Sequence, residues 1–242
     1  MLLIIAKNYI EMSKKAADIV SMEINKKPNL RLGLATGSTP LGMYEELIKY
    51  YKEKKIDFSK VHVFMLDEYY PISKNNKNCY YYYTQEKILN HVNIIKSNIN
   101  ILNGETKNPE KLCQEYDKKI RKNPLDLQIL GVGVNGHIGF NEPGSSFYSK
   151  TRLLKLTKNT RKINSRFFKD LDKVPISALT IGIGTIMKTR KLILLANGKN
   201  KAVAIKHLIN GKISSKWPVS FLRKHKNLIL IVDKEAARLI KI

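Results

Sequence analysis

The chain alternates short, nearly continuous apolar runs with longer amphipathic stretches, and this alternation limits the folds that it can adopt. Continuous Ile, Leu and Val runs are typical of β-strands that are covered on both faces. The pattern predicts one α/β domain over residues 1–242, with a mostly parallel, Rossmann-like central sheet flanked by helices. Strands are predicted at Leu2–Ala6, Leu30–Ala35, Val61–Leu66, Leu125–Gly131, Ala178–Ile183, Leu192–Ala196 and Leu228–Val232, and helices at Tyr9–Ile24, Leu41–Lys54, Tyr80–Asn90, Pro109–Lys122 and Lys199–Ile209.

The chain is strongly basic, because 44 Lys and Arg residues stand against 20 Asp and Glu residues, a formal net charge of +24. Such a charge is compatible with nucleic-acid binding. The lysines are nevertheless spread along the whole chain, and Lys, Ile and Asn are all frequent, as AT-rich codon usage produces. We therefore expect no nucleic-acid partner and a basic surface that attracts anionic small molecules.

The opening apolar segment, Met1–Ala6, is interpreted as a strand, since no basic segment precedes it and no small-residue cleavage site follows it. The apolar runs fall short of the roughly 18 residues that a membrane helix needs. We expect a cytoplasmic protein with no membrane partner. Cys79 and Cys113 are too few for a disulfide framework or a zinc site and are expected to be free thiols.

Ligands of such folds gather beyond the carboxyl ends of the strands, so chemistry is expected in the segments that follow strands. After the second predicted strand come Thr36, Gly37, Ser38 and Thr39, and then Pro40 and a helix. Gly37 allows a tight turn, and hydroxyl groups beside the free N–H groups of a helix start can bind an anion, most naturally a phosphate. The alternative is a simple turn in which Thr39 caps the helix.

Asp67 and Glu68 directly follow the third predicted strand and precede two tyrosines. In a partly dry cleft, desolvation raises the pKa of a carboxyl group toward the range of a useful general base. The alternative is a solvated turn before Pro71. Because only His62 adds a further ligand nearby, and it lies within the strand, no metal site is predicted.

A glycine-dense loop at residues 131–144 follows the fourth predicted strand and contains a formal G-x-G-x-x-G match. A dinucleotide-binding loop should open a helix and precede an acidic residue by about 20 positions. Further glycines and a proline follow instead, and Leu, Lys or Thr occupy the positions around 156, so no such cofactor is predicted. The loop can instead approach a small ligand closely, with His137 and Glu142 acting as a pair in which the carboxylate fixes the imidazole tautomer.

Two basic residues are candidate phosphate ligands. Arg166 precedes an aromatic pair, and its planar guanidinium group suits phosphate geometry. Lys201 follows another predicted strand, at the start of a helix. The alternative for each is an ordinary solvated side chain in a basic protein.

Taken together, these motifs resemble the family of glucosamine-6-phosphate deaminase (isomerising). The Gly133–Pro143 segment contains the most specific part of the resemblance, His137–Pro143. The matching segments occur in the family's order and cover nearly the whole chain: Leu34–Pro40, Asp67–Tyr69, Gly133–Pro143, Asn164–Phe168 and Gly198–Lys201.

The resemblance implies that D-glucosamine 6-phosphate and water are converted to D-fructose 6-phosphate and ammonia, with no metal or organic cofactor. It implies that Asp67 takes the C2 proton and that His137, oriented by Glu142, helps to open the pyranose ring. The Thr36–Thr39 loop matches phosphate-binding positions, as do Arg166 and Lys201. The segment at about residues 152–173 matches a lid that moves over the site.

The catalytic set implied by the resemblance also includes Asn135, and this residue departs from the family pattern. Many members have Asp at this position, which completes a carboxylate–histidine–carboxylate arrangement. With Asn135, only Glu142 is a charged partner of His137, so we expect a lower imidazole pKa than two carboxylates produce.

A second departure concerns regulation. Longer hexameric members bind N-acetylglucosamine 6-phosphate through positions that match Ser145, Arg152 and Leu154. Leu154 replaces the family's lysine, and the chain ends at Ile242 without the long C-terminal extension. We expect a monomer or small homo-oligomer that binds a sugar phosphate without this allosteric activation.

Two alternative functions are open at this stage. A 6-phosphogluconolactonase-like sugar-phosphate hydrolase shares the fold, but it needs no base for a C2 proton, so Asp67-Glu68-Tyr69 favours the deaminase. The choice between the gluco and galacto epimers of the substrate is not readable. A non-catalytic sugar-phosphate sensor attached to nucleic acid would need a DNA-binding module, and no helix-turn-helix pattern flanks the predicted sheet.

Overall fold

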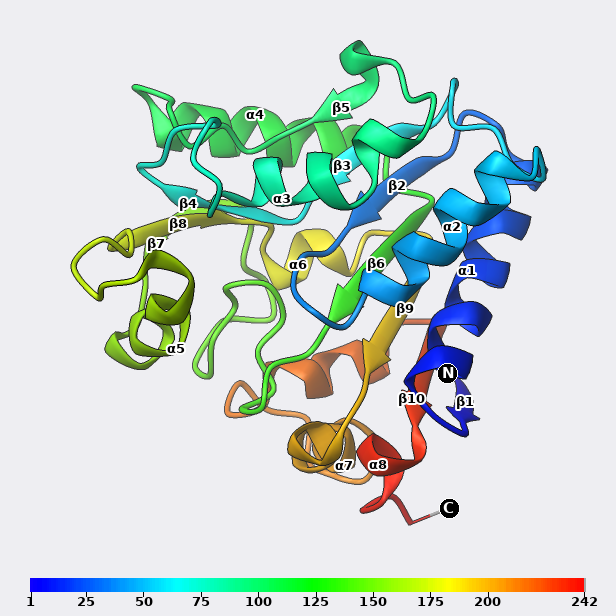
Figure 1. Ribbon diagram of the computed structural model, residues 1–242. Helices are drawn as coiled ribbons and strands as arrows, with labels where there is room; N and C mark the ends of the chain where they lie inside the picture. Colours follow the sequence, from blue (N-terminus) through cyan, green and yellow to red (C-terminus); the bar gives the residue numbers. More distant parts are fainter. Residues whose placement is uncertain (242) are drawn as a thin grey trace.

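The computed structural model describes residues 1–241 and contains a large parallel sheet, as predicted (Figure 1). Its seven strands have the order β1-β10-β9-β6-β2-β3-β5, and each neighbouring pair is parallel. The strands are β1 (Leu2–Ala6), β2 (Arg31–Leu34), β3 (His62–Met65), β5 (Ile99–Asn100), β6 (Leu127–Gly131), β9 (Lys191–Ala196) and β10 (Leu228–Asp233).

A second sheet, which the sequence analysis did not predict, has three antiparallel strands: β4 (Asp67–Tyr70), β8 (Ser177–Thr180) and β7 (Arg152–Lys155), in that order. The predicted strand Ala178–Ile183 therefore ends early, and Ile183 begins a short helix, α6 (Ile183–Ile186). The sheet escapes prediction because its strands have four residues each and pair with partners far away in the sequence, as Asp67 pairs with Thr180.

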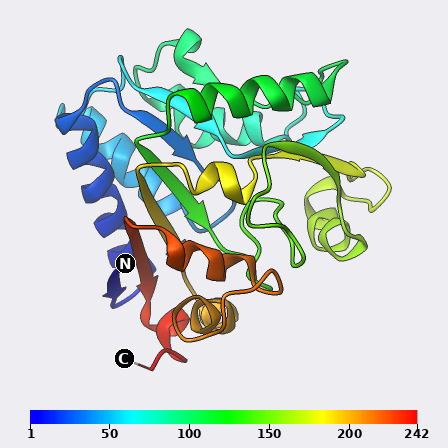
Figure 2. The ribbon, with the colours of Figure 1, turned by 180° about the vertical axis from the view of Figure 1, so that it is seen from behind.

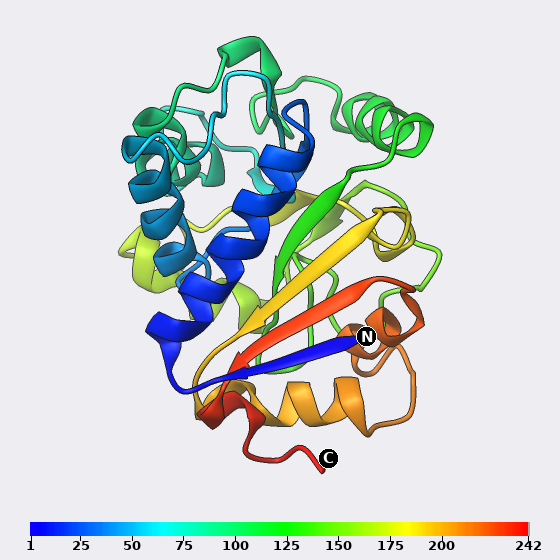
Figure 3. The same cartoon turned by 90° about the vertical axis from the view of Figure 1, so that its right-hand side faces the viewer.

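Helices cover both faces of the large sheet (Figures 2 and 3). Neighbouring residues of one strand face opposite layers, as Ile193 packs with α1 and α2 whereas Leu194 packs with α4 and α7. This two-sided burial explains why the strands are continuous apolar runs. The helices are α1 (Tyr9–Lys26), α2 (Leu41–Lys52), α3 (Tyr80–Lys87), α4 (Pro109–Lys122), α5 (Lys158–Phe168), α7 (Ala202–Ile209) and α8 (Lys234–Ala237), with 3-10 helices at Leu89–His91, Lys96–Asn98, Lys199–Lys201 and Pro218–Lys224.

Helix bounds agree with prediction where the sequence carries a capping signal. Asn108 caps α4 through its side chain, and Pro109 occupies the first turn, where a missing N–H costs nothing. The predicted helix Tyr80–Asn90 instead stops at Lys87, because the backbone of Ile88 leaves the helical region without a glycine or proline to mark it. No helix within residues 1–241 is long and apolar enough to cross a membrane.

The topology places the segments that carry the candidate site residues at one edge of the large sheet. Because β2, β3, β6 and β9 are parallel, their carboxyl ends meet at the same edge. The chain after each of these strands carries one of the motifs described above. Helix α5 lies apart from the large sheet, below the small one in the view of Figure 1.

Candidate active site

The Thr36–Thr39 loop makes a tight turn between β2 and α2. Gly37 adopts a φ of +94°, in the region that favours glycine. Helix α2 is preceded by Pro40 and has no side-chain cap, while the Thr39 hydroxyl lies 3.0 Å from the Asn197 side-chain oxygen. The alternative that Thr39 only caps the helix is therefore wrong.

Three tyrosines from three different helices hold the carbonyl groups of this loop. None was predicted, because each lies at least nine positions away in the sequence. With the carbonyl groups fixed, the N–H groups of Gly37–Thr39 have no acceptor within residues 1–241, which is the arrangement of an anion site. Tyr44 donates to the carbonyl of Ala35, Tyr83 to that of Gly37 and Tyr9 to that of Ser38.

Asp67 and Glu68 are buried at the start of β4, with 5% and 4% of their surface exposed. The alternative of a solvated turn is therefore wrong. Glu68 accepts hydrogen bonds from three backbone N–H groups, those of residues 69, 80 and 81. In contrast, the Oδ1 atom of Asp67 has no hydrogen-bond partner within the described chain. Of these two acids, Asp67 is therefore the one with a carboxylate oxygen that is available to a ligand.

Burial controls the protonation of both acids. It raises the pKa of Asp67 to about 8, and the neighbouring charge of Glu68 adds to this effect. Burial also raises the pKa of Glu68 to about 7, although its three N–H donors act in the opposite direction. Both carboxyl groups therefore titrate near neutral pH and can exchange a proton in that range.

Gly139 brings the loop after β6 against Asp67. Its φ is +57°, and a Cβ atom placed on it would lie 3.1 Å from Asp67 Oδ2. The backbone of the His137 loop therefore forms a wall beside the carboxyl group. A larger residue at Gly139 would press on the proposed base.

Asn135 lies between His137 and Glu142. His137 Nδ1 is 2.7 Å from Asn135 Oδ1, and Asn135 Nδ2 donates to Glu142 Oε2 at 2.8 Å. Nδ1 itself is 3.7 Å from that carboxylate oxygen. The predicted pair is thus a three-residue hydrogen-bonded relay, and Glu142 orients the imidazole through the amide of Asn135.

The relay specifies the state of the imidazole ring. Since the Asn135 amide nitrogen donates to Glu142, its oxygen accepts from Nδ1, which leaves Nε2 without a proton in the neutral ring. Burial lowers the pKa of His137, the charge of Glu142 raises it, and Lys201 lowers it further. A neutral imidazole with a free Nε2 can accept a proton from a bound molecule.

The structure also places the two predicted phosphate ligands. Burial lowers the pKa of Lys201, and the nearby positive charge of Arg166 lowers it further, so these two cations lie near each other. The Thr39–Asn197 contact brings the anion loop to the segment that carries Lys201. Arg166 projects from α5, with its guanidinium group 4.7 Å from the Phe167 ring.

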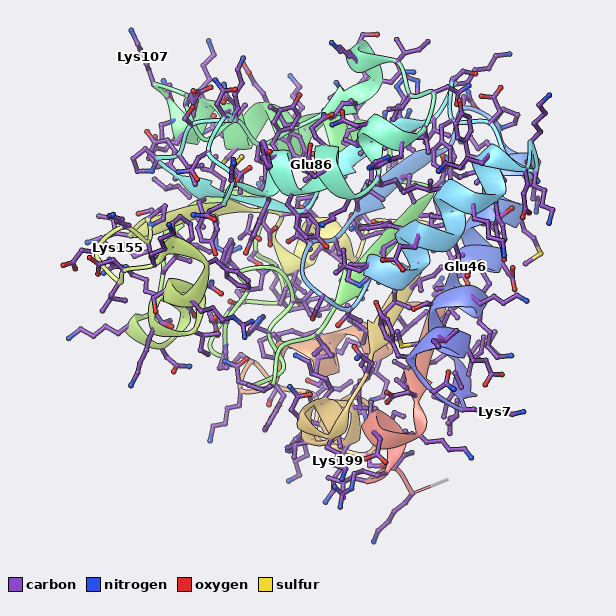
Figure 4. All side chains as sticks on the ribbon, viewed as in Figure 1. Lys7, Glu46, Glu86, Lys107, Lys155 and Lys199 are labelled. Atoms are coloured by element: carbon purple, nitrogen blue, oxygen red, sulfur yellow. The ribbon has the colours of Figure 1, made fainter. Side chains whose placement is uncertain are left out.

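The remaining basic residues are distributed around the molecule. Figure 4 shows Lys7, Lys107 and Lys155 at separate edges of the structure. Both cysteines are free, as predicted, and the structure buries them. Within the described part of the chain, no three His, Cys, Asp or Glu side chains are grouped so that they could hold a metal ion.

An anion loop with two nearby cations, a buried carboxyl group and a histidine relay form a candidate site of the class that suits a phosphorylated small molecule. The comparison with known proteins agrees with this class. Residues 7–230 match the family described as glucosamine-6-phosphate isomerases/6-phosphogluconolactonase, and the chain belongs to this family.

Relatives with curated names extend over almost the whole chain. The chain is 52% identical to a glucosamine-6-phosphate deaminase of Thermoanaerobacter sp. (strain X514), covering 99% of this chain and 95% of the relative. It is 53% identical to a glucosamine-6-phosphate deaminase of Clostridium novyi (strain NT), covering 96% of both. The resemblance inferred from the motifs is thereby confirmed.

Two solved structures resemble this chain to different degrees. The structure of a monomeric glucosamine-6-phosphate deaminase has a TM-score of 0.96 and 39% identity, covering 99% of this chain and all of the other. The 6-phosphogluconolactonase of Trypanosoma brucei has a TM-score of 0.79 and 18% identity, over 99% and 98% of the two chains. The second likeness shows the fold alone.

Proposed function

We propose that this chain converts D-glucosamine 6-phosphate and water to D-fructose 6-phosphate and ammonia, with Asp67 as the base that moves the C2 proton. Relatives that are 52% identical over nearly the full length are glucosamine-6-phosphate deaminases. The observation that carries the residue assignment is the buried Asp67 carboxyl group, whose Oδ1 has no partner and whose pKa is raised to about 8.

The phosphate group anchors the substrate. It accepts hydrogen bonds from the N–H groups of Gly37–Thr39 and from the hydroxyls of Thr36 and Ser38, since the Thr39 hydroxyl donates to Asn197, and Lys201 and Arg166 neutralise its charge. Anchoring at a position remote from C2 allows binding energy to align the reacting carbon.

His137 opens the pyranose ring. The free Nε2 of the neutral imidazole takes the proton of the anomeric hydroxyl and returns a proton to the ring oxygen as the C1–O5 bond breaks. The imidazolium form is transient, and Glu142 stabilises it through the amide of Asn135.

Asp67 then moves a proton between carbons. Its carboxylate takes the proton from C2 of the open aldehyde while the ammonium group gives one of its protons to O1, which leaves a neutral enolamine. The protonated carboxyl group returns the C2 proton to C1, which gives a C2 iminium ion. This ion adds water and releases ammonia and a proton, leaving the ketone of fructose 6-phosphate. The positive charge of the substrate's ammonium group favours the ionised carboxylate when the substrate is bound.

The test is to measure ammonia and fructose 6-phosphate formed from glucosamine 6-phosphate by the wild-type protein and by Asp67→Asn. We expect equal amounts of the two products from the wild type and no turnover by the variant, which still binds substrate. Hydrolysis of 6-phosphogluconolactone is measured in parallel. Turnover of that lactone alone, or wild-type turnover by the variant, would contradict the proposal.

We further propose that the protein acts as a monomer or small homo-oligomer and that residues 152–173 act as a lid. The structural relative at 39% identity is described as monomeric, which supports the first part. The proposed lid comprises β7, α5 and the turn after it, and α5 carries Arg166 near Lys201. Light scattering of the purified protein tests the oligomeric state, and a hexamer would contradict the proposal of a monomer or small homo-oligomer.

A further inference from the structure

Thr160 connects α5 to the histidine relay. It is the third residue of the helix, and only 9% of its surface is exposed, whereas Lys158 and Asn159 before it are exposed. Its hydroxyl group donates a hydrogen bond to Glu142 Oε1 at 2.7 Å. This is the oxygen of Glu142 that Asn135 does not use.

The hydrogen bonds around Thr160 have one consistent direction. The Thr157 hydroxyl lies 2.8 Å from Thr160 Oγ1 and accepts the backbone N–H of Thr160 at 3.0 Å, as the cap of α5. Since the Thr160 proton is given to Glu142, Thr157 donates to Thr160. One directed chain therefore leads from the cap of α5 through Thr160 to Glu142, and a second leads from His137 through Asn135 to the same carboxylate.

We propose that Thr160 is a positioning residue for ring opening, because its hydroxyl group fixes the Glu142 carboxylate that orients His137 through Asn135. The inference rests on the proposed deaminase function and deepens it. Both carboxylate oxygens of Glu142 are then held, one by Asn135 and one by Thr160, so the relay is complete only with α5 in this position. Thr160 does not reach the reacting atoms itself and acts through Glu142.

The proposal predicts a selective effect on turnover. Removing the donor leaves Oε1 of a half-buried carboxylate without its partner and allows the side chain to rotate. Thr160→Val keeps the shape of the side chain and should lower kcat about 10-fold or more, with KM changed less than about 2-fold, since the phosphate ligands are untouched. Thr160→Ser keeps the hydroxyl and should retain most of the wild-type kcat. Ser165→Ala removes a hydroxyl of the same helix that bonds only to the Lys162 carbonyl and should leave kcat unchanged.

Two further measurements separate positioning from a structural role. The acyclic alcohol 2-amino-2-deoxy-D-glucitol 6-phosphate needs no ring opening, so Thr160→Val should bind it with wild-type affinity. In a Glu142→Gln background, Thr160→Val should lower kcat less than about 2-fold, because the group through which it acts is already altered. If Thr160→Val does not fold, Thr160→Ala serves in the same comparisons.

Three outcomes with the single variants would overturn the proposal: wild-type kcat in Thr160→Val, equal losses in the Val and Ser variants, or a loss of affinity for the acyclic alcohol. A full additional loss in the Glu142→Gln background would also overturn it. These outcomes are distinct from failure of the proposed function, in which the wild-type protein itself would release no ammonia from glucosamine 6-phosphate.

Discussion

Replacing Asp67 with Asn should stabilise the protein at alkaline pH. The pKa of this buried carboxyl group is about 8, against 3.8 for the free side chain. Between these two values the unfolded chain has lost a proton that the folded protein still holds, so the free energy of unfolding falls as pH rises. Above pH 8 the folded protein carries a buried charge, which an amide of the same shape does not have.

The magnitude follows from the pH interval. Each pH unit within the interval lowers the free energy of unfolding of the wild type by about 1.36 kcal/mol. Between pH 5 and pH 8 the stability of Asp67→Asn relative to the wild type therefore rises by at most about 4 kcal/mol. For a chain of this size, 1 kcal/mol moves the melting temperature by roughly 2–4 °C. The upper limit for the relative gain in melting temperature is therefore roughly 8–16 °C.

The assay is thermal unfolding of wild type and Asp67→Asn at pH 5 and pH 8.5, followed by circular dichroism. Asp57→Asn is the matched control, because backbone and side-chain donors from Ser59 and Asn93 lower the pKa of that exposed acid. Asp57 is ionised in the folded and unfolded states throughout this range, so its variant should differ from wild type by the same amount at both pH values. A pH-independent difference for Asp67→Asn would refute the desolvated carboxyl group and, with it, the basis for a base near neutral pH.

Three other substitutions test separate parts of the site. Arg166→Ala should raise KM about 10- to 100-fold in steady-state assays, because a charge-assisted phosphate contact is lost. Tyr83→Phe frees the carbonyl group of Gly37, which Tyr83 holds at 2.6 Å, and should raise KM about 5-fold with little change in kcat. Asn135→Asp places a carboxylate at the His137 Nδ1 atom and should raise the pKa of His137 in an NMR titration.

Each of these tests has an internal comparison. Lys162→Ala removes an exposed basic residue from the same helix as Arg166 and should leave KM unchanged. Tyr51→Phe removes a tyrosine hydroxyl away from the loop, and its KM should equal that of the wild type. The pKa of His62, which burial lowers and which lies at the start of β3, should be the same in wild type and in Asn135→Asp. Unchanged KM in the first two site variants, or an unchanged or lower imidazole pKa in the third, would contradict the assigned contacts.

Local patterns in the sequence predicted six of the seven strands of the large sheet, the helices α1, α2, α3, α4 and α7, and the segments that carry chemistry, but missed β5, α5 and α8. A strand buried on both faces must be apolar throughout, and a surface helix must repeat its apolar residues every three to four positions, so both are visible in a short window. The position of ligands beyond the carboxyl ends of parallel strands then selected Asp67, His137 and the Thr36–Thr39 loop. The resemblance to a family added their roles, because the His137–Pro143 segment is specific.

The tertiary structure decided what depends on contacts between distant segments. The small antiparallel sheet, the tyrosines that hold the anion loop and the bond from Thr160 to Glu142 each join residues at least nine positions apart. The raised pKa of Asp67 likewise comes from burial beneath Gly139 and beside Glu68, and burial is a property of the folded chain. A sequence shows which groups can ionise or donate, but only packing determines which of them lose water and which partner each one meets.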